Sequence, residues 1–225
     1  MKVIRPITVC ALIFLFAAIG FAQESKPIEI TAAGRHLAKV LDQMDVEHHW
    51  LAEKYVKWRT GEPLDKKVDD NKPHTHCSAF AAAAAAELGI YILRPPQHSS
   101  VMLADAQSDW LKGEGKKEGW QPVATALESQ RLANRGDLVV AIYKEPDPKK
   151  HGHVAIVLPS AKSEAKIREE GPQIIQAGME NHASASLKEG FKHHPAAFRD
   201  NLIRFYSHPV PAKQDAETDD KAKKE

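Results

Sequence analysis

The chain has 225 residues, with 31 basic against 30 acidic side chains and 43% hydrophobic residues. This length suits a single domain, and the balanced charge lacks the basic excess of nucleic-acid-binding proteins, so we expect no nucleic-acid partner. Only two cysteines occur, Cys10 and Cys77.

The N-terminus predicts export. Lys2 and Arg5 precede an apolar run that ends at Phe21, followed by the small residue Ala22. Residues 1–22 therefore read as a secretory signal peptide, and we expect a secreted or periplasmic protein. The apolar run is short for a membrane span, and no later stretch is long and apolar enough, so we expect no transmembrane segment. Cys10 leaves with the signal peptide, which makes Cys77 the single thiol of the exported protein.

Helical patterns dominate the first half of the exported chain. Thr31 can cap a first helix, and Asp45 can cap a second over residues 46–58, where aromatic residues recur at helical spacing. Two further helices are predicted over residues 101–112, capped by Ser99 or Ser100, and over residues 124–134.

The central stretch is a predicted helix whose first turn carries Cys77 and which Gly89 terminates. Thr75 or the backbone near it can cap the helix, and residues 81–86 are six consecutive alanines, which favour helix and add little bulk. The positive end of a helix favours the thiolate form of a cysteine, so Cys77 is a candidate nucleophile. The alternative is that Cys77 is an ordinary small buried residue.

The hydrophobic period changes to that of strands after Gly136. Residues 138–143 and 153–158 predict an antiparallel hairpin covered on both faces, and residues 173–176 and 202–207 predict two more strands. Helices followed by a small antiparallel sheet indicate an α+β fold. We expect one domain over residues 23–210 and a disordered charged tail over residues 211–225.

A cysteine hydrolase needs a base near its thiol, and His153 is the candidate. It opens the second strand of the hairpin, and Ala155 shares its face of that strand. Because Ala155 is small, we expect the alanine-rich helix to pack closely on this face and bring Cys77 to His153.

Three segments resemble the papain-like cell-wall hydrolases, which include NlpC-type endopeptidases and CHAP amidases. The segments are Cys-Ser-Ala-Phe from Cys77, Gly-Asp-Leu-Val-Val from Gly136, and Gly-His-Val-Ala-Ile-Val from Gly152. The resemblance covers residues 71–178. It implies a papain-like core in which Cys77 and His153 form a catalytic pair that cleaves amide bonds in peptidoglycan peptides, with no cofactor or metal. It leaves open whether the enzyme is an endopeptidase or an amidase.

Two further roles in such a site have candidates. Gln176 ends the strand expected beside His153, and it resembles in position the polar third residue of CHAP amidases; its amide oxygen could orient the imidazole. Asn181 is the alternative third residue. Asn71 lies six residues before Cys77, where papain-type enzymes carry an oxyanion-hole glutamine, although it is equally an ordinary loop asparagine.

Two other functions compete with the hydrolase. Cys77 together with His74, His76 and His153 could form a tetrahedral zinc site in a secreted zinc-binding protein. The same fold could also serve as a catalytically inactive wall-binding or inhibitor module. The sequence does not indicate the oligomeric state.

Overall fold

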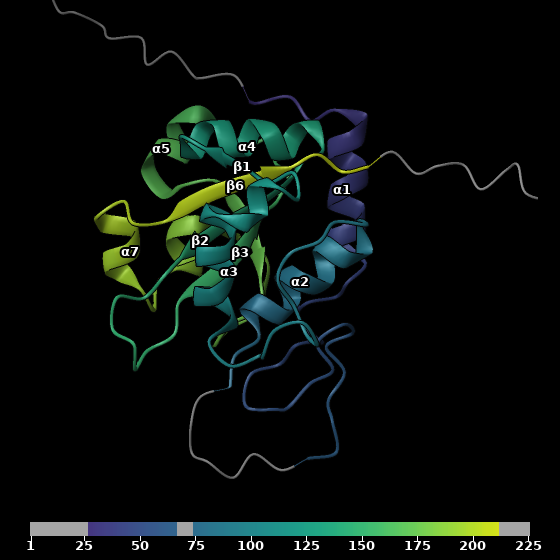
Figure 1. The fold of residues 1–225 in the computed structure, drawn as a ribbon. Helices are drawn as coiled ribbons and strands as arrows, with labels where there is room; N and C mark the ends of the chain where they lie inside the picture. The colour runs from purple at the N-terminus through teal and green to yellow at the C-terminus, as the bar shows by residue number, and fades with distance from the viewer. Residues whose placement is uncertain (1–26, 67–73, 212–225) are drawn as a thin grey trace, which may run out of the picture.

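The computed structural model describes residues 27–66 and 74–211 (Figure 1). The predicted signal peptide, Asn71 and nearly all of the predicted charged tail lie outside these residues. Within them, no helix has the length and apolar character needed to cross a membrane.

The described residues form seven α-helices, one short 3-10 helix and six strands. The helical elements are α1 (Ala32–Asp42), α2 (Cys77–Glu87), α3 (Leu103–Lys112), η1 (Glu114–Lys116), α4 (Ala126–Arg135), α5 (Glu164–Glu170), α6 (Leu187–Gly190) and α7 (Pro195–Arg199). The strands are β1 (Gln121–Val123), β2 (Leu138–Tyr143), β3 (His153–Val157), β4 (Gln173–Gln176), β5 (His182–Ser186) and β6 (Arg204–His208).

All six strands join one antiparallel sheet in the order β1-β6-β2-β3-β4-β5. β2 and β3 lie at its centre, and every residue of both strands is buried. The predicted hairpin, the third strand beside it and the mixed fold with a small antiparallel sheet are confirmed. The fourth predicted strand is β6, which begins two residues later than expected and pairs with β2.

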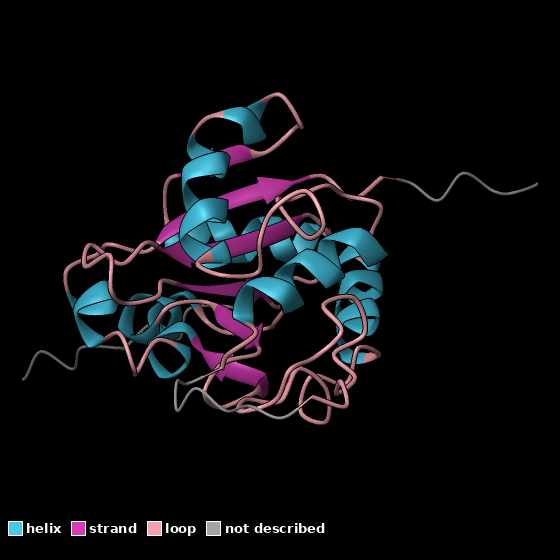
Figure 2. Cartoon of the chain, turned by 60° about the horizontal axis from the view of Figure 1, so that its bottom comes forward, coloured by secondary structure: helices cyan, strands magenta, loops and turns pink. Residues whose placement is uncertain are grey.

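Helices cover both faces of the sheet (Figure 2). On one face, α2 and α3 pack against the alternate residues of the central strands that include Val154 and Ile156. On the other face, α4, α6 and α7 pack against the residues between them, which include Ala155 and Val157. The strict alternation of a strand therefore decides which helix each residue of β3 meets.

The alanine run explains why α2 can lie so deep in the protein. Residues 77–85 are all buried, and Ala82, Ala84 and Ala85 have no exposed surface. Alanine favours helix and occupies little space, so neighbouring segments can approach α2 from all sides. The ring of Phe80, a residue of α2, meets that of Trp50 edge to face, with 5.2 Å between ring centroids.

The predicted helix over residues 46–58 is wrong. This segment is a series of turns in which Asp45, Trp50 and Glu53 adopt positive φ angles, a conformation that a helix excludes. Trp50 is 2% exposed, and its indole N–H donates to the backbone oxygen of Trp58 at 3.0 Å. Trp50 is buried in the core, while Tyr55 and Trp58 are partly exposed, and a loop rather than a helix places all three.

Helix starts also differ from the predicted ones. The helix predicted over 101–112 begins at Leu103, after Met102 in a left-handed conformation, and neither Ser99 nor Ser100 caps it. Thr31 does cap α1, with its side chain accepting from Gly34 N–H at 3.1 Å. The sequence did not indicate β1, β5 or α5, which are short elements with few apolar residues.

The buried side chain of Asn134 joins three parts of the chain that are distant in sequence. Its amide nitrogen donates to the backbone oxygens of Ile28, Glu29 and Ser160, and its amide oxygen accepts from Ser160 N–H and from the Gln130 side chain. The start of the described chain, α4 and the segment after β3 are thereby held together.

Because α2 is enclosed, enlarging one of its buried alanines should destabilise the fold. We expect Ala84→Leu to lower the free energy of unfolding by about 2–3 kcal/mol, since the added atoms must displace packed neighbours. Ala32→Leu adds the same atoms at an exposed position of α1 and should change the free energy of unfolding by less than about 0.5 kcal/mol. Urea denaturation measures both, and equal effects would show that α2 is loosely packed.

Candidate active site

Cys77 opens α2 at the point where the helix meets the start of β3. The thiol is buried, with 5% of the residue exposed, and the backbone N–H of Val154 hydrogen-bonds to it. The N-cap residue is His76, which makes no side-chain cap bond, so the predicted cap by Thr75 is not formed.

Burial controls the ionisation of this thiol. Removal from water raises the pKa of Cys77 from 9.0 to about 11, although the backbone N–H groups of Val154 and Ser78 act in the opposite direction. The nearby carboxylate of Asp105 raises the pKa further. The backbone N–H groups at the helix start lower the pKa of the thiol, as expected, but desolvation raises it by more.

His153 and Gln176 meet on neighbouring strands. His153 Nε2 lies 2.8 Å from Gln176 Oε1, and both side chains are buried. An amide oxygen can only accept, so Nε2 carries the proton and Nδ1 of the neutral ring is the basic nitrogen. The amide nitrogen of Gln176 donates to the backbone oxygen of Glu180 at 3.4 Å, which fixes the orientation of the amide. Burial lowers the pKa of His153, and the Gln176 bond partly offsets this.

Cys77 and His153 belong to different layers of the fold. Cys77 lies in the same core cluster as Val154 and Ile156, whereas the imidazole of His153 contacts Phe191 and His194 on the other face of the sheet. Among the described residues, no hydrogen bond reaches His153 Nδ1 or joins His153 to the thiol.

The predicted packing on the His153 face is also wrong. Ala155 belongs to the core on the α4 side, so α2 approaches the face of β3 that carries Val154 instead. The thiol and the imidazole still lie at the same end of β3, because Val154 immediately follows His153.

The alternative third residue, Asn181, has a structural role. Its amide oxygen accepts from Gly178 N–H at 3.0 Å, and its amide nitrogen donates to the backbone oxygens of Val46 and His49 at 2.6 and 2.8 Å. These bonds tie the turn after β4 to the turns that precede α2. Of the two candidates, only Gln176 is directed at His153.

The residues of the predicted zinc site do not converge. His76 Nε2 bonds to the backbone oxygen of Lys54 at 2.7 Å, the ring of His74 contacts Tyr55, and His153 lies on the opposite face of the sheet from Cys77. Within residues 27–66 and 74–211, no three His, Cys, Asp or Glu side chains are arranged to hold a metal ion.

Asp105 on α3 is a component of this region that the sequence did not single out. Its carboxylate accepts from the backbone N–H groups of Glu145 at 3.0 Å and Gly152 at 3.2 Å, which are the two ends of the β2–β3 loop. A Cβ atom at Gly152 would collide with Asp105 and with the Tyr143 backbone, so glycine is required before His153. An acidic residue in the first turn of a helix is common, so nothing in the sequence distinguishes Asp105 for this role.

A cavity of about 1050 Å³ lies elsewhere, at the far end of α2. It is lined mainly by α1, by the C-terminal end of α2 and by the segment after α4, and neither Cys77 nor His153 borders it.

Neither the known family models nor the curated proteins contain a match to this chain.

The pKa of Cys77 predicts a specific dependence of stability on pH. The unfolded thiol loses its proton near 9.0 and the folded thiol near 11, so the stabilisation is complete below pH 9 and is lost as pH rises through that interval. At a pH of about 10.5, the free energy of unfolding should have fallen by about 2 kcal/mol more in the wild type than in Cys77→Ala. Urea denaturation of both proteins at pH 8 and at this pH measures the difference, and parallel losses would contradict it.

Proposed function

We propose that this protein is an exported cysteine hydrolase that cleaves amide bonds in peptidoglycan peptides. In this proposal Cys77 is the nucleophile, His153 is the base and Gln176 orients His153. The observation that carries it is the 2.8 Å bond between His153 Nε2 and Gln176 Oε1, at the start of the strand whose next N–H group contacts the Cys77 thiol. The predicted signal peptide and the motif resemblance support a cell-wall substrate.

Each group has a defined step in this reaction. His153 Nδ1 accepts the thiol proton, and the Cys77 sulfur attacks the carbonyl carbon of the amide bond. The tetrahedral intermediate collapses to a thioester as the imidazolium returns the proton to the departing amine. Water, deprotonated by Nδ1, then attacks the thioester and releases the carboxylic acid and the thiol. Gln176 keeps the proton on Nε2 throughout, so that Nδ1 stays available.

The reaction requires the His153 ring to approach the thiol when substrate binds. In the free protein the thiol is neutral because it is buried, and the imidazole faces the other side of β3. Catalytic hydrogen bonds are often formed only in the substrate complex, and the start of a strand is where a small shift can bring the two groups together.

The separation of Cys77 from His153 favours one alternative, a catalytically inactive wall-binding module on the same fold. Such a protein would bind peptidoglycan fragments without changing them. Product analysis separates the two functions directly.

The test of the nucleophile is incubation of the protein with peptidoglycan fragments, followed by mass spectrometry of the products. The wild type should release peptides, and Cys77→Ala should lower the rate by at least about a thousandfold with no loss of folding, because alanine suits the helix. Cys77→Ser serves as a control that keeps the shape of the side chain. Binding without cleavage by the wild type would favour the inactive module.

The test of the orienting residue compares two glutamines of the same strand. Gln176→Ala should lower kcat/KM by about tenfold to a hundredfold, because His153 loses the acceptor that fixes its tautomer and position. Gln173→Ala is the matched control, since Gln173 points to Ser184 at 2.7 Å and away from His153. A loss of activity in both variants, or in neither, would contradict the assigned role of Gln176.

A further inference from the structure

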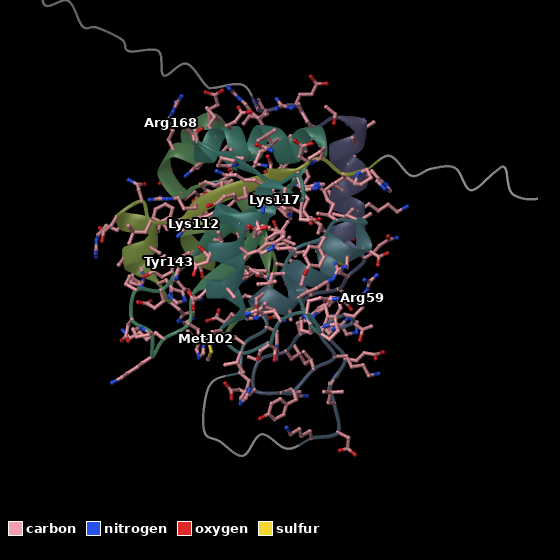
Figure 3. The ribbon with its side chains drawn as sticks, viewed as in Figure 1. Arg59, Met102, Lys112, Lys117, Tyr143 and Arg168 are labelled. Carbon is pink, nitrogen blue, oxygen red and sulfur yellow. The ribbon has the colours of Figure 1, made fainter. Side chains whose placement is uncertain are left out.

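A second imidazole lies against the candidate base. The ring of His194, the residue before α7, stacks on that of His153, with 5.8 Å between centroids and 18° between planes. Phe191 contacts the same imidazole edge to face at 4.8 Å. Tyr143, which contacts His194 from β2, is labelled in Figure 3.

The two imidazoles have different surroundings. His153 is 7% exposed, and among the described residues its ring has one hydrogen-bond partner, the neutral amide of Gln176. His194 is half-buried, and its Nδ1 lies 3.8 Å from the carboxylate of Glu145, which Tyr143 also contacts through its hydroxyl. A positive charge is therefore better accommodated on His194 than on His153.

The two histidines also have different electrostatic neighbours. Burial lowers the pKa of both histidines. At His194 the neighbouring His153 lowers the pKa further, while Glu145 and Asp105 raise it. No carboxylate acts on His153.

We propose, building on the proposed function, that His194 is a positioning residue for His153: it takes the first proton that the pair binds, and its charge then keeps His153 neutral. Two imidazoles this close cannot both be charged without strong repulsion, so the pair binds protons in two separated steps. With the first proton on His194, His153 remains able to accept the thiol proton in mildly acidic solution. The device extends the active range of the base to lower pH.

The charged and titratable groups that face the pair come from four places. Those acting on His194 are Glu145 from the β2–β3 loop, Asp105 from α3, Tyr143 from β2 and His193 beside it in the chain. His193 is itself exposed, and its Nε2 lies 3.7 Å from a carboxylate oxygen of Glu180. Its exposure makes it a suitable control.

Replacing His194 should change the pH dependence of the reaction in a defined direction. Without the charge of His194, His153 becomes protonated at higher pH, and activity falls sooner as the solution is acidified. For His194→Gln we expect the ratio of kcat/KM at pH 5 to that at pH 7 to fall about threefold relative to the wild type. His193→Gln should leave this ratio unchanged.

Nuclear magnetic resonance titration of the histidine rings tests the proton order without any substrate. In the wild type, His194 should take up a proton at higher pH than His153, and Glu145→Gln should move the His194 midpoint to lower pH. In His194→Gln, the His153 midpoint should move to higher pH.

The inference is overturned if His153 is protonated first, or if its midpoint is the same in His194→Gln and wild type. It is also overturned if His193→Gln has an equal effect. Because the wild-type titration stands by itself, a variant that fails to fold does not prevent a decision. A protein with the expected titrations but no hydrolysis would contradict the proposed function and leave the proton order intact.

Discussion

The close packing of α2 against β3 is the constraint on which the rest of the site depends. A helix of alanines carries so little volume that its first residue, Cys77, rests directly on the backbone of Val154. The same contact removes the thiol from water. A helix dipole stabilises an adjacent anion by about 0.3–1 kcal/mol, up to ~2 in partly buried sites. A thiol pKa raised to about 11 means that desolvation exceeds the opposing effect of the backbone N–H groups that face the thiol.

The alternation of β3 divides the reactive groups between two layers. Cys77 and Asp105 belong to the helices on one face, while His153, Gln176 and His194 lie on the other. The first residues of the strand are the place where the layers come together, because the pairing between β3 and β4 begins only at Ile156. A mechanism that joins thiol and imidazole must therefore act at this end of the strand, where β3 pairs with β2 but not with β4.

Sequence reasoning succeeded where local signals and the fold agree. The alanine helix with Cys77 in its first turn and the β2–β3 hairpin follow from composition and from the short apolar runs, and strand alternation together with the family resemblance pointed to Gln176 beside His153. It failed where distant segments decide the outcome. The turns around Trp50 show helical spacing of aromatics, yet Asn181, more than a hundred residues later, holds them through its amide. Likewise, Ala155 alone could not show which face of β3 packs against α2, because small residues occur in the core on both sides of the sheet.

The contribution of His194 could not be read from the chain either, because forty residues separate it from His153, and they include two further strands and two helices.

Asp105 accepts hydrogen bonds from both ends of the β2–β3 loop, and this arrangement affects which changes of sequence the protein can tolerate. The carboxylate holds Glu145 and Gly152 from a helix that is not part of the loop, so the position of His153 is fixed independently of the residues between them. Those residues are free to vary in length and composition without moving the imidazole. Relatives of this protein, or engineered versions of it, could thus acquire new contacts at the edge of the site by altering the loop alone, provided that the aspartate and the glycine remain.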